Sequence, residues 1–199
     1  MVTFYSLFPT ITEAIIFQIV LSLWILSEIV GGTLIPFIRR GGVVLNRKDR
    51  GSGMFIFFII FLSIITAIIF ASASIAMLPT WFFYPGIVVM ILGIIFRQWS
   101  IAVLGRFFSG TVSTQEGQKV VEKGPYKYIR HPSYTGALLI LIGIGLALQS
   151  WGAVITLVLL FSLAYGYRIH IEENILISEL GDPYIDYKKR TKRLIPYIV

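Results

Sequence analysis

The chain has 199 residues, of which 56% are hydrophobic and only 14% are charged, so it is far more apolar than an ordinary soluble domain. It contains no cysteine, which excludes disulfides, thiolate metal ligands and a cysteine nucleophile. Its net charge of +7 is a feature that nucleic-acid-binding proteins share. Because the basic residues cluster between long apolar stretches, we attribute the charge to membrane topology and expect no nucleic-acid partner.

Five apolar stretches approach the length of about 20 residues that crosses the hydrocarbon core of a bilayer. They predict membrane-spanning helices over residues 12–38, 53–77, 81–104, 132–148 and 152–167. The first stretch lacks a basic region before it and a small-residue cleavage site, so we expect it to remain as a membrane helix. The sequence therefore predicts an all-α integral membrane protein with about five transmembrane helices. The last two form a helical hairpin, for which a tilted or re-entrant arrangement also fits.

Basic residues occupy the connections after the first and third spans and the C-terminal tail. They are Arg39, Arg40, Arg47, Lys48, Arg50, Arg106, Lys119, Lys123, Lys127, Arg130, Arg168, Lys188, Lys189, Arg190, Lys192 and Arg193. Five crossings place all three regions on one side, and positively charged loops remain cytoplasmic. We therefore expect the N-terminus outside and the C-terminus in the cytoplasm. Glu28 and Arg97 lie inside spans at comparable depth, where their cost in lipid predicts a mutual ion pair or a polar acceptor cavity.

Most of the polar and titratable residues cluster after Leu104, and the segment 105–136 is expected to fold against the membrane surface. Gly117, Gly124 and Pro125 mark turns, whose exposed backbone groups can hold an adenine or ribose edge. Pro132 suits the first turn of a helix, which we therefore expect to begin at His131. Its N-terminal N–H groups and positive dipole end would face the cytoplasm and could receive a carboxylate.

A second polar cluster follows the fifth span. Arg168 and Glu172 share one helical face at i,i+4 spacing, and taken alone such a pair is an ordinary surface ion pair. Gly181 and Pro183 are expected to end this helix. Because the hairpin makes the last two spans antiparallel neighbours, His131 and Tyr134 should lie at the depth of Arg168 and Glu172. The two clusters are thus predicted to converge in a cytoplasmic pocket.

The run GPYKYIRHPSYTG, followed by a hairpin and an Arg-x-x-x-Glu-Glu segment, resembles the isoprenylcysteine carboxyl methyltransferase family, whose wider relatives include phospholipid N-methyltransferases. The resemblance extends from about Gly105 to the C-terminus. Composition, with no polar tail or linker, predicts a single membrane domain over residues 1–199, with three N-terminal spans in 1–104. The catalytic half, 105–199, would contain a cofactor-binding connection, the hairpin and a C-terminal cytoplasmic helix.

The activity implied by the resemblance is transfer of a methyl group from S-adenosylmethionine, with S-adenosylhomocysteine as product, to the carboxylate of a lipophilic, isoprenylcysteine-like acceptor. The cofactor contacts implied are Thr111, Gln118, Lys119, Val120, Val121, Tyr126, His131, Pro132, Ser133, Tyr134 and Glu172. Arg168 matches the family's arginine at the acceptor side, where a guanidinium could orient the carboxylate. Gln118 departs from the family pattern, which often has histidine at that position. No metal site is implied.

Several alternatives stay open. A phospholipid N-methyltransferase or a thiol S-methyltransferase would use the same cofactor on a different acceptor. A nicotinamide-dependent membrane reductase lacks support, since the sequence has no glycine-rich dinucleotide fingerprint. The non-enzyme alternatives are a small membrane transporter or a scaffold; transport is disfavoured because there is no inverted repeat and the polar residues gather at one face. The sequence leaves the oligomeric state and the identity of the acceptor open.

Overall fold

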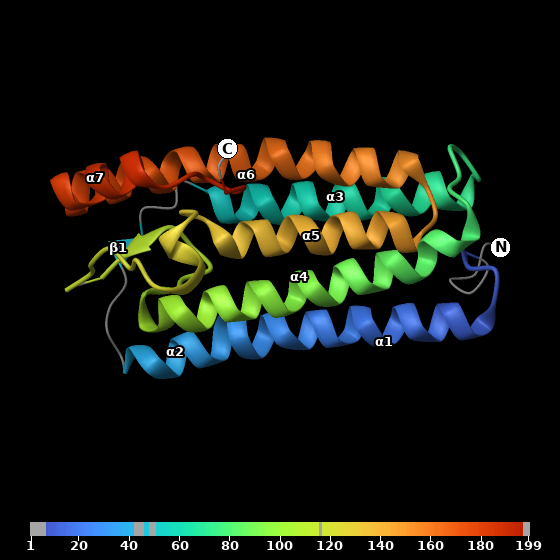
Figure 1. Cartoon of the computed structure of the whole chain (residues 1–199), viewed down its shortest axis with the longest axis horizontal. Coiled ribbons are helices and arrows are strands. Elements are labelled where there is room, and N and C mark those ends of the chain that lie inside the picture. The colour runs from blue at the N-terminus through green and yellow to red at the C-terminus, as the bar shows by residue number, and fades with distance from the viewer. Residues whose placement is uncertain (1–6, 42–45, 48–50, 116, 197–199) are drawn as a thin grey trace.

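Five long helical segments lie side by side in the computed structural model, which describes residues 7–41, 46–47, 51–115 and 117–196 (Figure 1). The first segment joins α1 (Ile11–Ser27), the π-helical segment η2 (Glu28–Leu34) and α2 (Ile35–Arg40). The others are α3 (Ser52–Ser72), α4 (Phe83–Leu104), α5 (Pro132–Ala147) and α6 (Trp151–Leu180). A short helix, α7 (Asp182–Arg190), follows α6. The predicted basic residues Lys48 and Arg50 lie outside the described residues.

Four segments are long and apolar enough to cross a membrane, namely Ile11–Arg39, Ser52–Ser72, Thr80–Phe107 and Trp151–Leu180. The remaining apolar helix, α5, has 16 residues, which corresponds to a length of about 24 Å. The predicted all-α architecture and the hairpin of α5 and α6 are thereby confirmed. Large apolar side chains such as Phe57, Phe61, Leu159 and Leu163 are exposed on the outside of the bundle, as a bilayer-facing surface requires.

The helix α6 is much longer than the predicted span over 152–167, because no glycine or proline interrupts it between Gly166 and Gly181. Its 30 residues correspond to about 45 Å, so its last turns project beyond α5. Gly181 ends it with a positive φ of 62°, a conformation that glycine adopts without strain. Pro183 follows in the first turn of α7, as predicted.

The helices α4 and α5 approach each other closely through glycines. A Cβ atom on Gly136 would lie 2.8 Å from the backbone nitrogen of Arg97, and one on Gly143 would lie 2.6 Å from that of Met90. Small residues at a helix contact allow such an approach in a membrane. These contacts fix the start of α5 against α4.

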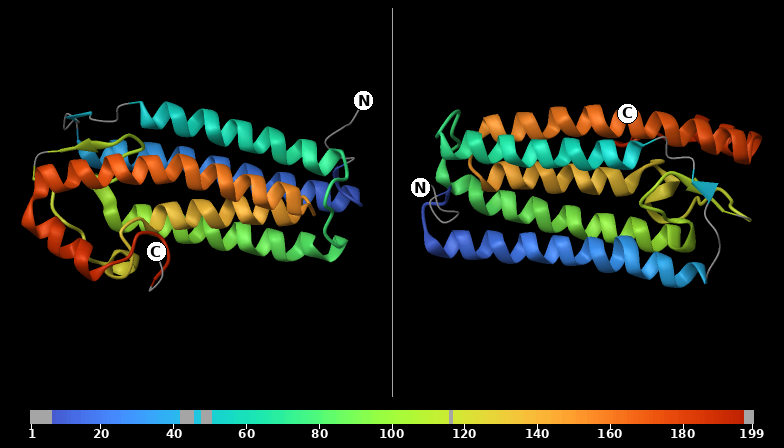
Figure 2. Two further views of the ribbon diagram at one scale, coloured as in Figure 1. Left: turned by 90° about the horizontal axis from the view of Figure 1, so that it is seen from above. Right: turned by 180° about the vertical axis from the view of Figure 1, so that it is seen from behind.

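The two ends of the bundle differ in character. At one end two short neutral turns pair, where the N–H of Leu78 donates to the carbonyl of Gln149 over 2.7 Å. The opposite end carries α7, the connection 105–131 and an unpredicted antiparallel pairing between β1 (Asn46–Arg47) and β2 (Ser113–Thr114) (Figure 2). The basic connections therefore share one end, as five crossings require.

The chain after α7 folds back onto the start of α5. The N–H of Arg130 donates to the carbonyl of Lys192 over 2.7 Å, and the N–H of His131 donates to that of Arg193 over 3.0 Å. The hydroxyl of Thr135 donates to the carbonyl of Leu194 over 2.6 Å. These bonds hold the C-terminal segment against the polar end of the bundle.

Candidate active site

A pocket lies at the polar end, bounded by the connection 105–131, the first turn of α5, the projecting part of α6 and α7. Its empty volume is about 860 Å³, including space open to solvent. Of the predicted site residues, those that line it are Thr111, Gln118, Lys119, Val120, Val121, Tyr126, His131, Ser133, Tyr134 and Glu172. Pro132 and Arg168 do not line it. Pro132 occupies the first turn of α5, and its ring is buried there.

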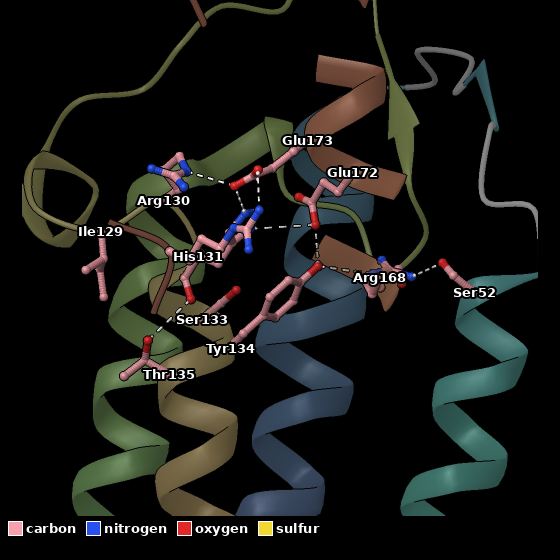
Figure 3. A network of polar contacts seen from close by, with 12 residues as sticks. Ser52, Ile129, Arg130, His131, Ser133, Tyr134, Thr135, Arg168, Glu172 and Glu173 are labelled. Atoms are coloured by element: carbon pink, nitrogen blue, oxygen red, sulfur yellow. Dashed lines mark hydrogen bonds and ion pairs between the residues drawn. The ribbon is translucent and has the colours of Figure 1, made fainter. Parts of the chain in front are cut away.

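Tyr134 joins the two predicted polar clusters. Its hydroxyl donates to Oε2 of Glu172 over 2.5 Å and accepts from Nε of Arg168 over 3.1 Å (Figure 3). The imidazole of His131 stacks on the Tyr134 ring, with centroids 5.3 Å apart. The predicted convergence of His131 and Tyr134 with Arg168 and Glu172 is therefore present in the structure.

The guanidinium of Arg168 lies on the buried side of Tyr134 and forms hydrogen bonds to three parts of the fold. Besides Tyr134 on α5, it donates to the carbonyl of Gly110 over 2.8 Å and to the hydroxyl of Ser52 on α3 over 3.2 Å. Arg168 is only 3% exposed. It thus stands behind the pocket wall and reaches the pocket through Tyr134.

The connection 105–131 is stabilised by its own polar side chains. Oε1 of Gln118 accepts from the N–H of Gln115 over 3.1 Å, and Nε2 of Gln115 donates to the carbonyl of Arg106 over 2.8 Å. The N–H of Thr111 donates to the hydroxyl of Ser109 over 3.3 Å. The Gln118 side chain therefore closes a turn in the wall of the pocket.

A buried ionic cluster around Glu173 was not predicted. Glu173, only 3% exposed, accepts from Nε of Arg130 over 2.8 Å and from Nζ of Lys188 over 3.1 Å, and Nη2 of Arg193 lies at 3.6 Å. Arg130 also donates to the carbonyl of Lys188 over 3.1 Å and lines the pocket. The consecutive pair Glu172-Glu173 could have indicated this cluster. Neighbouring residues of a helix point about 100° apart, so the two carboxylates can contact different partners.

The sequence did not predict the pocket side chains that come from the projecting part of α6 and from α7. Ile175, Leu176, Leu180, Tyr184 and Tyr187 line the pocket. The hydroxyl of Tyr187 donates to the carbonyl of Tyr126 over 2.7 Å. Burial raises the pKa of the phenols of Tyr126, Tyr184 and Tyr187 above the usual value, so all three are neutral donors at physiological pH.

The hydroxyl of Tyr184 is a buried polar atom of the pocket with no hydrogen-bond partner within the described part of the chain, whereas Nε2 of His131 lies 3.5 Å from Oε1 of Glu173. Buried polar atoms are almost always satisfied in folded proteins. Tyr184 and His131 both line the pocket. The pocket is therefore suited to a ligand that carries polar groups of its own.

A second hollow opens on the membrane side of Tyr134, and we call it the membrane groove. Its lining residues are Trp24, Glu28, Gly53, Ile56, Phe57, Ile60, Phe61, Ile64, Arg97, Ala137 and Tyr165, and its empty volume is about 810 Å³, including open space. Tyr165 packs edge-on against Tyr134, with ring centroids 4.8 Å apart. The pair of tyrosines thus separates the polar pocket from the apolar groove.

Residues 86–178 match the family described as isoprenylcysteine carboxyl methyltransferase (ICMT), so the resemblance indicated by the motifs is confirmed and begins earlier in the chain than they implied. Protein-S-isoprenylcysteine O-methyltransferase B of Arabidopsis thaliana is 30% identical over 120 residues, which cover 59% of this chain and 61% of that protein. A Tribolium castaneum protein named protein-S-isoprenylcysteine O-methyltransferase is 32% identical over 120 residues, covering 59% of this chain and 43% of its own length. The chain thus spans less than two thirds of these relatives.

The fold also matches a solved structure, that of a eukaryotic intramembrane Ras methyltransferase, ICMT. The TM-score is 0.66 at 24% sequence identity, and the match covers 98% of this chain and 71% of that one. At this identity the likeness establishes the fold. The helical bundle with its projecting C-terminal helices is therefore shared with a membrane protein of this family.

Proposed function

We propose that the chain is an integral membrane methyltransferase that uses S-adenosylmethionine to methylate the carboxylate of a lipophilic, isoprenylcysteine-like acceptor. The observation that carries the proposal is the position of Tyr134, Glu172 and Arg168 between a polar pocket and an apolar groove. The relatives named as isoprenylcysteine O-methyltransferases support the same activity. We further propose that residues 1–199 act as one membrane domain.

The residues of the pocket fit S-adenosylmethionine, which when bound supplies a methyl group on a positively charged sulfur. The cofactor combines an aromatic base, ribose hydroxyls and an amino acid. Val120, Val121 and Leu176 offer apolar surface to the base, and the second carboxylate oxygen of Glu172 can accept from a hydroxyl or ammonium group. The unpartnered hydroxyl of Tyr184 offers a further polar contact.

The amino-acid carboxylate of the cofactor is assigned to the first turn of α5. The positive end of a helix dipole favours an anion there, and the basic side chains of Arg130 and Lys119 line the same pocket. Ser133, also in this turn, is buried at the pocket wall. Together these groups would fix one end of the cofactor.

The acceptor is assigned to the membrane groove, with Arg168 as the group that orients its carboxylate. Arg168 contacts Ser52, which precedes Gly53 of the groove wall, and Tyr134, which lines the pocket. A carboxylate is already ionised near neutral pH, so no general base is required. Positioning and exclusion of water are then the main tasks of the site.

We propose that the polar end faces the cytoplasm and that the N-terminus lies outside, since positively charged connections remain cytoplasmic. The cofactor would then reach the pocket from water, and the acceptor would reach the groove from the bilayer. These routes follow from the solvent preference of each ligand. The lipid bilayer and a prenylated or other lipophilic acceptor are the partners proposed.

The test uses the purified full chain in detergent and in vesicles. Calorimetry should detect S-adenosylmethionine binding, and Glu172→Ala should weaken it by about tenfold or more, the effect of losing one charge-assisted contact. Radiolabelled methyl transfer should then favour a farnesylated thiol acid over phosphatidylethanolamine and over a prenyl thiol. Absence of binding at millimolar cofactor would remove the proposal. Preferred labelling of the amine or the thiol would replace the carboxylate acceptor.

A further inference from the structure

The ion pair of Glu28 and Arg97 lies away from the pocket, in the part of the bundle that faces the bilayer. Nε of Arg97 donates to Oε1 of Glu28 over 2.5 Å, and Nη2 donates to Oε2 over 2.7 Å. Charged groups at such a depth are costly, and a buried pair is by itself weak evidence for stability. The pair therefore calls for a further explanation.

The third nitrogen of the Arg97 guanidinium provides an explanation for the ion pair. Nη1 of Arg97 donates to the backbone carbonyl of Ser133 over 2.9 Å. Ser133 lies in the first turn of α5, next to Tyr134, and both residues line the pocket. Because a guanidinium holds its donors in one rigid plane, the two bonds to Glu28 also fix the direction of Nη1. Arg97 thus connects η2 and α4 to the wall of the pocket.

The surrounding backbone accommodates this arrangement. Gly136 lies directly against Arg97, since a Cβ atom there would be 2.8 Å from the Arg97 Cα. Glu28 begins the π-helical segment η2, a distortion that frequently marks functional sites. A Cβ atom on Gly32 of that segment would lie only 3.2 Å from Oε2 of Glu28. A side chain at either glycine would crowd the ion pair.

We propose that Arg97, oriented by Glu28, is a positioning residue for the cofactor pocket. It holds the first turn of α5 through the Ser133 carbonyl and so fixes where Ser133 and Tyr134 meet the ligand. The inference rests on the proposed function, because S-adenosylmethionine is the ligand whose binding it concerns. Glu28 and Arg97 also line the membrane groove, so direct contact with the acceptor is the competing role.

The decisive variant is Glu28→Leu/Arg97→Met, which replaces the pair by apolar side chains of similar size. Such replacements commonly leave a fold as stable as before or more so, which keeps the variant informative. We expect its melting temperature to be unchanged or raised, while the Kd for S-adenosylmethionine rises about fivefold or more, as for the loss of one positioning contact. The rise in the cofactor Kd should exceed any rise in the KM for the farnesylated thiol acid, because both residues also line the groove assigned to the acceptor.

The matched control is Gln98→Ala, which removes another polar contact between the same helices, that of Nε2 of Gln98 with the hydroxyl of Ser27 at 3.2 Å. This control should bind the cofactor as wild type does. An unchanged cofactor Kd in the double variant would overturn the inference, and so would a change confined to the acceptor KM. A wild-type chain that binds no S-adenosylmethionine would instead overturn the proposed function.

Discussion

The hydroxyl of Tyr134 donates to Oε2 of Glu172 over 2.5 Å, across the contact between α5 and α6. Hydrogen bonds to an ionised carboxylate are stronger than neutral ones, so this bond fixes the Glu172 side chain. Tyr134→Phe should therefore raise the Kd for S-adenosylmethionine about tenfold, as expected for the loss of a bond to a charged group. Calorimetry measures this change. Tyr167→Phe, at an exposed position on α6, is the control, and equal affinities in both variants would contradict the prediction.

Arg168 should affect turnover more than cofactor binding, because it reaches the pocket only from behind Tyr134. Arg168→Lys keeps the charge but loses the planar set of donors that serves Ser52, Gly110 and Tyr134 at once. We expect kcat to fall about 100-fold, the size of effect seen when one positioned donor is lost. The cofactor Kd should change less than fivefold, as calorimetry can check.

The control for Arg168→Lys is the same substitution at Arg190, which forms an exposed ion pair with Glu122. Arg190→Lys should leave kcat within twofold of wild type, since exposed pairs contribute little. If Arg168→Lys lowered cofactor affinity as strongly as kcat, its assignment to the acceptor side would be wrong.

Glu173 should be important for stability rather than for catalysis. It is the buried carboxylate on which Arg130 and Lys188 converge, and Arg130 in turn holds the carbonyls of Lys188 and Thr191 in the C-terminal segment. Glu173→Gln leaves these cations without their charge partner, which should cost about 3 kcal/mol or more of unfolding free energy. Glu122→Gln removes the partner of an exposed pair and should cost at most about 1 kcal/mol. Denaturant unfolding in detergent compares them, and equal losses would contradict the prediction.

Much of this arrangement could be predicted from the sequence, for identifiable reasons. Charge placement and hydropathy specify which ends of the helices lie together, and a short turn makes α5 and α6 neighbours. That neighbourhood brings Tyr134 to Glu172 without any knowledge of side-chain conformations. The pairing of Glu28 with Arg97 was likewise one of two predicted outcomes, since both charges lie inside spans.

Other parts depend on contacts that hydropathy does not encode. The helix was predicted to end at Gly181, but hydropathy does not show that its polar projection faces a pocket, so Leu176 and Leu180 were not assigned to it. The return of the C-terminal segment onto Arg130 and His131 is made by backbone hydrogen bonds, which leave no residue pattern. The third contact of Arg97, to the carbonyl of Ser133, cannot be predicted from the sequence for the same reason. The side-chain pairs of Tyr134 with Glu172 and of Glu28 with Arg97 were predictable, whereas these backbone contacts and the ionic cluster around Glu173 were not.

The stability of the polar end should fall in alkaline solution. Burial raises the pKa of the phenols of Tyr126, Tyr184 and Tyr187 in the folded chain. In the unfolded chain the same phenols lose their protons at about pH 10. Above that pH the unfolded chain binds fewer protons, so stability is fully present below about pH 10 and declines as the pH rises. Each tyrosine contributes at most about 1.4 kcal/mol per pH unit.

The measurement is the unfolding free energy between about pH 9 and pH 11, compared across variants. Tyr187→Phe should show a shallower decline than wild type, although it also loses the bond to the Tyr126 carbonyl and starts from a lower stability. Tyr128→Phe, at an exposed position, should keep the wild-type slope. Identical slopes for all three proteins would exclude Tyr187 as a source of alkaline sensitivity.

The contact of Gly136 with Arg97 gives the sharpest steric prediction. In Gly136→Ala the new methyl group would lie 2.6 Å from the Arg97 Cβ and 2.8 Å from its backbone nitrogen, so α4 and α5 must separate. Overpacking of this kind costs about 1–3 kcal/mol. It should also weaken S-adenosylmethionine binding, because the displaced turn of α5 carries Ser133 and Tyr134.

Gly166→Ala on α6 is the matched control, since nothing lies within 4 Å of a Cβ atom there. Alanine is favoured over glycine inside a helix by up to about 1 kcal/mol, so this variant should be as stable as wild type or more stable, with unchanged cofactor affinity. A Gly136→Ala chain that matched the control in both measurements would mean that α5 can shift along α4 without disturbing the pocket. The close contact between the two helices would then have no part in placing Tyr134.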